Sequence, residues 1–230
     1  MTFKRTIIPE FYPSGDELTS CLIGIGFRLF GKPVQNPNIE DTLVAASIEG
    51  LKGDWRVQSL LVDWLKVHAD KVLADRLVNL VLNLDQKEFK HVRIFWAAFA
   101  QIRHHDIRFK KLLSLVSSRR IGIAGENRSF LIQRNGEDSR FAKTCLRVPS
   151  KLLRHRPEDI LTPAELVQVH PSYRFRVLIG PTHRADMFAQ MELNQNVSTY
   201  ALAKQCYGSY RTAMAVKRDY AVLAKRLESL

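Results

Sequence analysis

The sequence predicts an all-α protein, in which an N-terminal antiparallel helical bundle or HEAT-like stack precedes a smaller C-terminal unit of helices. Two observations predict this class. Over most of the 230 residues, apolar side chains recur every three or four positions, which is the spacing of one face of a helix. The links between these segments are short, as at Lys52-Gly53, and short links make successive helices antiparallel neighbours. With 46% hydrophobic residues, the chain can also bury a substantial core.

The N-terminal part contains the longest series of predicted helices. An extended arm with two prolines over 2–15 precedes a helix that Ser14 or Asp16 caps and that ends near Leu29. Further helices are predicted at Ile39–Leu51, Asp54–Ala69, Lys71–Leu84, Phe89–Arg103 and Asp106–Ser117. The aromatic residues of these helices fall on apolar faces, so we expect them in the core: Trp55, Trp64, Phe95, Trp96 and Phe99.

The least regular stretch runs from 117 to 149. Two short apolar runs, Phe130–Gln133 and Phe141–Val148, flank Asn135-Gly136, a dipeptide typical of β-hairpin turns. We expect a small hairpin here, with a plain loop as the alternative. A short basic helix or turn at Ser150–Arg156 then ends before Pro157.

Helix-start signals are strong in the last third of the chain. Thr162, Pro163 and Glu165 form a predicted capping box with proline at the first helical position. Helices are expected from there to about His170, from Ser172 to Ile179, from His183 to Leu193, and as a final pair between Ser198 and Leu227, with no β-hairpin wing after it. The predicted division is 1–118 as a helical scaffold, 119–160 as a basic connecting segment and 161–230 as a C-terminal helical domain.

The positive charge of the chain is unevenly distributed. Lys and Arg exceed Asp and Glu by 12 in the whole sequence. Residues 1–100 contain 12 basic and 12 acidic side chains, whereas 101–160 contain 14 and 6, and 161–230 contain 9 and 5. Because the surplus is confined to one part, a local anionic partner explains it better than general solubility does.

The stretch Val197–Leu223 reads as a short helix, a tight turn and a longer helix. Ser198 caps the first helix and Ser209 the second, and we expect Gly208 to adopt the positive φ that ends a helix. The small or apolar residues Ala213, Val216, Tyr220 and Leu223 recur at helical spacing along the second helix.

This pattern resembles the helix-turn-helix of bacterial DNA-binding proteins. In that family a capped helix ends in Leu-Ala, a Gly-x-Ser turn follows, and a small apolar residue lies near the middle of the second helix. Leu202-Ala203, Gly208-Ser209 and Ala213 lie close to those positions. The family usually has Gly four residues after the Ala, where this chain has Tyr207, so we expect a longer or differently bent turn.

The resemblance implies a double-stranded DNA partner. The helix from Ser209 to Arg218 would enter the major groove, with base edges read at its N-terminal end. Candidate nucleic-acid-binding residues on this unit are Tyr200, Lys204, Ser209, Tyr210, Arg211, Thr212, Lys217 and Arg218. Side chains of the basic segment would extend the phosphate footprint or reach a second groove: Arg119, Arg120, Arg128, Arg134, Arg140, Lys143 and Arg147.

Other interpretations of the same residues remain open. The final helix pair also fits an ordinary helical hairpin that only packs. The helical part fits an interaction scaffold, or an antitoxin-like partner of another protein in a defence system. The Arg-rich loops fit RNA binding. A regulatory DNA-binding protein, alone, as a homodimer or within a larger complex, accounts for more of the observations than these alternatives do.

Catalytic and cofactor motifs are not found in the sequence. Phosphate-binding loops, nucleophile elbows and zinc-protease motifs are missing, so we expect no enzyme activity and no cofactor. The adjacent pair His104-His105 points in different directions on a helix and suits no metal site. The thiols Cys21, Cys145 and Cys206 show no metal or disulfide spacing, which suits buried thiols in a reducing cytoplasm. A DNA partner would place the protein near the nucleoid. No apolar run is long enough to span a membrane.

Overall fold

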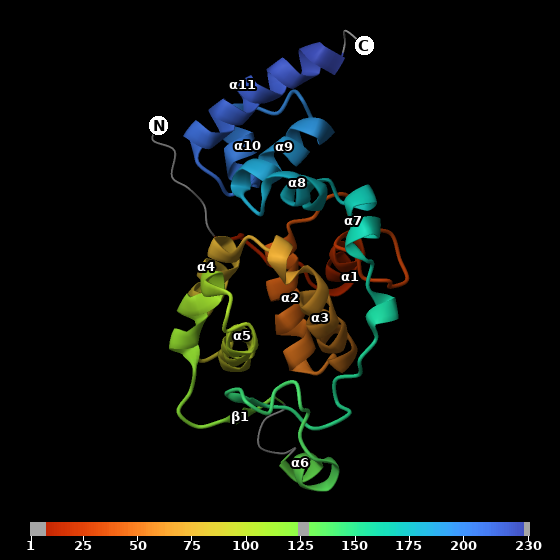
Figure 1. Cartoon of the computed structure of the whole chain (residues 1–230), viewed down its shortest axis with the longest axis vertical. Coiled ribbons are helices and arrows are strands. Elements are labelled where there is room, and N and C mark those ends of the chain that lie inside the picture. Colours follow the sequence, from red (N-terminus) through yellow and green to blue (C-terminus); the bar gives the residue numbers. More distant parts are fainter. Residues whose placement is uncertain (1–7, 124–128, 228–230) are drawn as a thin grey trace.

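The computed structural model describes residues 8–123 and 129–227, and in these ranges the protein is mostly helical, as the sequence predicts (Figure 1). The N-terminal elements are α1 (Gly15–Gly24), α2 (Ile39–Lys52), α3 (Trp55–His68), η1 (Ala69–Lys71), α4 (Ala74–Asn83), α5 (Lys90–Ile102) and η2 (Ile107–Leu115). The next are β1 (Ile121–Gly122), α6 (Ser129–Asn135), β2 (Leu146–Arg147), η4 (Pro157–Asp159), α7 (Pro163–Val169), α8 (Pro171–Ile179), α9 (His183–Leu193), α10 (Thr199–Gln205) and α11 (Tyr210–Leu227).

The helices predicted around strong caps have the expected bounds. Asn38 accepts a hydrogen bond from the Asp41 N–H at the start of α2, and Asp54 accepts from the first turn of α3. The capping box of Thr162 and Glu165 is formed at the start of α7. These local signals locate helix starts because the first N–H groups of a helix need acceptors from outside it.

Two predicted helices differ from the structure. The first ends at Gly24 and not near Leu29, because Gly26 has a φ of +100° and Phe27 pairs with Ile160 in an isolated β-bridge. The segment predicted as a helix at Asp106–Ser117 is the 3-10 helix η2. In both cases contacts with distant residues or a tighter turn override the apolar spacing.

The predicted β-hairpin is wrong. Residues 129–135 form α6, which separates β1 from β2 in the sequence. The two strands pair in parallel, whereas the strands of a hairpin are antiparallel. Gly136 has a φ of +77°, and its N–H donates to the Ile132 carbonyl at the end of α6. The Asn-Gly signal therefore ends a helix, because the positive φ of a hairpin turn is also the φ of a helix C-terminal glycine.

Two apolar cores organise the chain. The larger core contains side chains from α1 to α5 and extends through Phe141, Leu146 and Val148 to Tyr173 in α8. The smaller core belongs to α9, α10 and α11. Phe141, Leu146 and Val148 of the basic connecting segment are thus part of the larger core. The three cysteines are buried free thiols, as expected.

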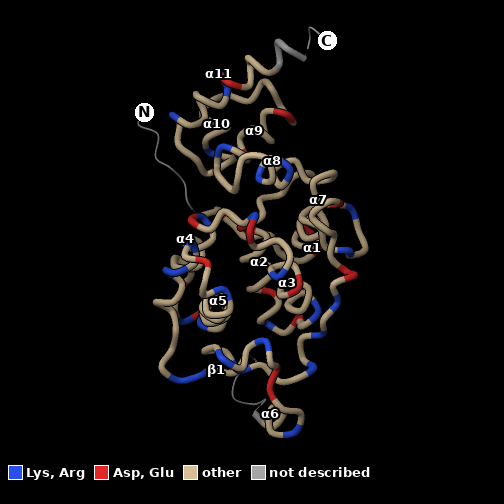
Figure 2. Tube along the Cα trace, viewed as in Figure 1, with Lys and Arg blue, Asp and Glu red and all other residues tan. Residues whose placement is uncertain are grey.

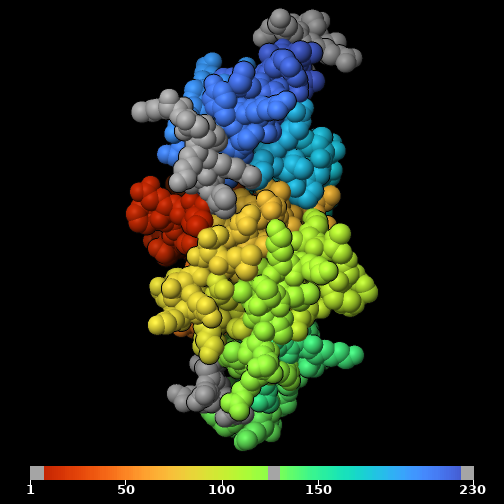
Figure 3. Space-filling model, turned by 90° about the vertical axis from the view of Figure 1, so that its left-hand side faces the viewer, coloured from red at the N-terminus to blue at the C-terminus, as the bar shows by residue number. Residues whose placement is uncertain are grey.

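The two cores are arranged along the longest axis of the molecule. In Figure 1, α11 lies at one end, β1 and α6 lie at the other end, and α2 to α5 lie between them. The view turned by 90° in Figure 3 shows the same order. No helix in the described ranges combines the length and apolar composition that a membrane span requires.

Candidate nucleic-acid interface

The helices α9, α10 and α11 form a three-helix unit around a shared core. The core side chains are Met187, Phe188, Met191, Val197, Leu202, Ala203, Cys206, Ala213 and Val216. Each helix has a hydroxyl at its N-cap: Thr182, Ser198 and Ser209 accept from backbone N–H groups at 3.3, 3.1 and 3.0 Å. We call α9–α11 the three-helix unit.

The turn between α10 and α11 differs from the expected one. Tyr207, and not Gly208, has positive φ, at +53°. Gly208 packs closely against α9, since a Cβ at this position would lie 2.3 Å from the Met187 Cε and would require that methionine to move. The residue in the left-handed conformation thus occupies the position where the family that the sequence resembles has glycine.

The side chain of Tyr207 offsets the cost of its backbone conformation. A left-handed non-glycine residue costs about 1–2 kcal/mol. The Tyr207 hydroxyl donates to Asp41 Oδ2 at 2.8 Å, and the Arg76 guanidinium lies 3.2 Å from the centre of the ring. Arg76 is itself paired with Asp41. Asp41 and Arg76 belong to α2 and α4, which are part of the helical body formed by α1 to α5 and their connections. The turn therefore fixes the three-helix unit to this body.

A buried arginine forms a second connection between the body and the unit. Arg176 of α8 donates to Glu40 Oε1 and Oε2 at 2.6 and 2.9 Å, and to Asp186 Oδ1 and Oδ2 at 2.7 and 2.8 Å. Arg176 is 1% exposed. Because Glu40 lies in α2 and Asp186 in α9, this pairing sets how α9 is placed against the body.

The pKa values of the two carboxylates bound by Arg176 depart from their ordinary values in opposite directions. Burial by itself raises the pKa of Glu40, but Arg176 and the Leu73 N–H hold it below its ordinary value. Burial also raises the pKa of Asp186, and Arg176 offsets this only in part. Relative to its ordinary value, the pKa of Glu40 is thus lowered and that of Asp186 is raised.

Sequence reasoning missed these connections. No role is assigned from the sequence to the carboxylates of Glu40, Asp41, Asp63 and Asp186, which are buried. An available signal was the position of Glu40 and Asp41 directly after Ile39 and directly before a run of small and apolar residues over 42–48. Charged side chains at such positions need partners inside the protein.

The outer face of α11 presents most of the predicted base-reading residues. Tyr210, Arg211, Met214 and Arg218 are exposed, whereas Ala213 on the opposite side is in the core. The side chain of Arg218 is 79% exposed and also contacts Asp219. In Figure 1 this helix lies at the far end of the molecule from the helical body. Lys204 and Tyr200 are exposed on α10.

Lys217 and Thr212 have structural roles that the sequence did not reveal. The Lys217 ammonium donates to the Val197 carbonyl at 2.5 Å, and the side chain is half-buried. The Thr212 hydroxyl lies 2.7 Å from the Ser209 hydroxyl at the N-cap of α11. Lys217 therefore ties α11 to the segment before α10, and we no longer assign it a phosphate contact.

The arginine-rich segment does not adjoin α11. Its strand and helix, β1 and α6, lie at the opposite end of the molecule (Figures 1 and 2). Arg119, Arg134 and Lys143 are exposed there, and Arg128 lies outside the described residues. This arrangement does not favour one continuous footprint with α11, and contact of the segment with a second groove stays a prediction.

Some arginines of this segment hold its backbone together. The Arg120 guanidinium donates to the carbonyls of Thr144, Phe141 and Leu146 at 2.7, 3.1 and 3.1 Å and pairs with Glu137. Arg140 pairs with Asp138 at 2.7 Å and donates to the Leu153 carbonyl. We therefore assign Arg120 and Arg140 structural roles.

The described residues contain no group of three or more His, Cys, Asp or Glu side chains that could hold a metal ion. The rings of His104 and His105 lie 3.6 Å apart on the surface without further ligands of this kind. Comparison with protein-family models, with curated proteins and with solved structures finds no match. We therefore infer the function from the geometry of the chain itself.

Proposed function

We propose that the protein binds double-stranded DNA by placing the N-terminal half of α11 in the major groove, with α2–α5 as the bundle that carries the three-helix unit. The supporting observation is the exposed face of Tyr210, Arg211, Met214 and Arg218 on a capped helix at the end of the molecule. The major groove, about 12 Å wide, admits one such helix.

The side chains on this face suit different parts of the duplex. Arg211, in the first turn of α11, has the planar fork that binds the O6 and N7 atoms of guanine. Met214 and Tyr210 offer apolar contact to thymine methyl groups. Lys204 and Tyr200 on α10 are placed to contact phosphates, which fix the position of the protein on the duplex. Arg218 follows two turns after Arg211 and extends the contact along the groove.

The biological role that fits this chemistry is regulatory. The chain would act as a transcription regulator or as the DNA-binding subunit of a larger complex, near the nucleoid in the cytoplasm. The interpretations as an interaction scaffold and as an RNA-binding protein predict different partners. A scaffold retains its partner at high salt and after nuclease treatment, whereas phosphate contacts weaken steeply with salt.

The test compares matched variants on duplexes selected from a random pool by the unaltered protein. Replacing Arg211→Ala and Arg218→Ala should weaken binding about tenfold or more, since one lost bidentate base contact costs about 1–3 kcal/mol. The control replaces Lys32→Ala and Arg56→Ala, two exposed cations of the helical body. Fluorescence anisotropy measures both. Equal affinities of the two variants would contradict the role of α11.

A further inference from the structure

The segment 117–156 has a large surplus of positive charge after its internal pairs are counted. Its described residues include nine Lys or Arg and two acidic side chains. Both carboxylates are already paired within the segment, Glu137 with Arg120 and Arg147, and Asp138 with Arg140. Five cations remain exposed, and we call them the basic end: Arg119, Arg134, Lys143, Lys151 and Arg154.

These five side chains make no hydrogen bond or ion pair with the described residues of the protein. Arg119, Arg134 and Lys143 lie on α6 or on the connections around it, and not on a long helix that could enter a groove. Lys151 and Arg154 lie between β2 and η4, where the Arg154 N–H donates to Ser59 of α3. Arg and Lys in such settings suit the phosphates of a nucleic-acid backbone, which are bound without reading the sequence. The chemistry at this end therefore differs from that of α11.

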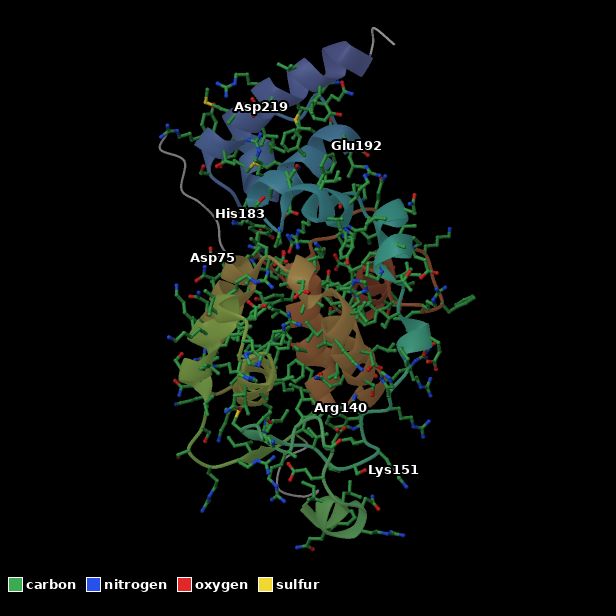
Figure 4. All side chains as sticks on the ribbon, viewed as in Figure 1. Asp75, Arg140, Lys151, His183, Glu192 and Asp219 are labelled. Carbon is green, nitrogen blue, oxygen red and sulfur yellow. The ribbon has the colours of Figure 1, made fainter. Side chains whose placement is uncertain are left out.

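The basic end and α11 are too far apart to contact the same stretch of groove. Figure 4 shows Lys151 toward one end of the molecule and Asp219 of α11 at the other. In Figure 1, α3 lies between α6, which carries Arg134, and the three-helix unit, and its 14 residues span about 21 Å at 1.5 Å per residue. This exceeds the Debye length of about 10 Å in 0.1 M salt, so the two ends attract phosphates independently.

We propose that the basic end is a second, sequence-independent surface for duplex DNA, and that a single molecule bridges two duplex segments. This inference rests on the proposed function of α11, which supplies the first contact. The helical body between the two ends has equal numbers of basic and acidic residues over 1–100. A nearly neutral body with a positive surface at each end can bind one polyanion at each end, because the sides of the body do not attract either polyanion.

Two variants separate the ends. The α11 variant carries Lys204→Ala, Arg211→Ala and Arg218→Ala. The basic-end variant carries Arg119→Ala, Arg134→Ala, Lys143→Ala, Arg154→Ala and Lys151→Asn. Asparagine is chosen at Lys151 because the backbone there has a φ of +67°, which asparagine tolerates. Each variant is the control for the other.

The assay tethers one duplex to beads and measures capture of a second, fluorescent duplex at low salt. The unaltered protein should capture the second duplex. Each variant should still bind a single duplex but capture about tenfold less of the second, and the combined variant should bind neither. Undiminished capture by the basic-end variant overturns the proposal. A dimer that binds one duplex with the α11 of each copy would give this result.

The outcomes also separate failure of this inference from failure of the proposed function. If only α11 binds DNA, the α11 variant loses all binding and the unaltered protein captures no second duplex. If only the basic end binds DNA, the basic-end variant loses all binding. The proposal is also overturned if the basic end captures structured RNA but no duplex DNA. It is likewise overturned if the basic end binds an acidic protein and the unaltered protein does not bridge two duplexes.

Discussion

The three-helix unit and the segment 117–156 are both rich in basic residues, but their arginines make different contacts. In the unit, Arg211 and Arg218 project from a regular helix whose core and caps are formed by other residues. In the segment, Arg120 and Arg140 bind backbone carbonyls and carboxylates of the same segment. A regular helix satisfies its own backbone groups, whereas irregular backbone needs side chains to satisfy them.

This difference shows why a count of charges does not identify a binding surface. Part of the basic surplus in 117–156 is used to hold loops, and only the exposed remainder is available to a partner. Arg176 of α8, outside the three-helix unit, is buried and pairs with Glu40 of the body and Asp186 of the unit. Four predictions, from the largest expected effect to the smallest, test this distinction between structural and exposed cations.

The strongest test removes the buried arginine that connects the unit to the body. Arg176→Ala leaves Glu40 and Asp186 buried without their cation, and should lower the free energy of unfolding by about 3–5 kcal/mol. Arg174→Ala, on the same helix, removes an exposed pair with Glu192 and a contact at 5.7 Å from the centre of the Phe175 ring, and should cost less than about 1 kcal/mol. Urea denaturation measures both. Similar losses of unfolding free energy for the two variants would show that the buried Arg176 contributes no more to stability than the exposed Arg174.

Acid should weaken the attachment of α7 and α8 to the body. Burial lowers the pKa of His170 and of His68 to about 4. His170 Nδ1 accepts from the Tyr173 N–H, and His68 Nε2 lies 2.9 Å from the Leu161 carbonyl. Both imidazoles are therefore neutral in the folded protein at pH 7.

In the unfolded chain a histidine has a pKa of about 6.5. Between pH 6.5 and 4 the unfolded chain thus binds protons that the folded protein excludes, and stability falls as the pH falls. The contribution of each histidine is about 3 kcal/mol, fully present above pH 6.5 and lost near pH 4. Free energies of unfolding across this range should fall less steeply for His170→Asn than for the unaltered protein. Identical slopes would show that His170 does not contribute.

A neighbouring pair of arginines tests the basic segment itself. Arg120→Ala removes the donor to three carbonyls and should cost about 1–3 kcal/mol. Arg119→Ala, at an exposed position, should change stability by less than about 0.5 kcal/mol while weakening capture of the second duplex. Thermal or urea unfolding gives the first comparison. A stable Arg120→Ala protein would show that this arginine belongs with the exposed cations.

The smallest expected effect concerns the start of α11. Ser209→Ala removes the N-cap acceptor and should destabilise the protein by about 1 kcal/mol. Ser14 occupies the same position before α1 but makes no side-chain cap hydrogen bond, so Ser14→Ala should have almost no effect. Equal changes in the urea midpoint of the two variants would show that the hydrogen bond of the Ser209 cap does not stabilise the protein.

Local sequence signals were sufficient for most helices. The starts of α2, α3, α7, α9 and α10 follow from cap residues that bond within three positions along the chain. The short turn before α11 and the exposure of Tyr210 and Arg211 also follow from local spacing. The same signals failed at Asn135-Gly136, because a positive φ is shared by hairpin turns and helix ends.

The sequence by itself determined that this protein is mostly helical, where its helices begin, and that its positive charge lies beyond residue 100. Only the tertiary structure decided that the charge is divided between two ends, and that Glu40, Asp41 and Tyr207 join the three-helix unit to the body. The reason is physical. A cap or a turn depends on neighbours in the chain, whereas the partner of a charge comes from any segment that folding brings within a few ångströms.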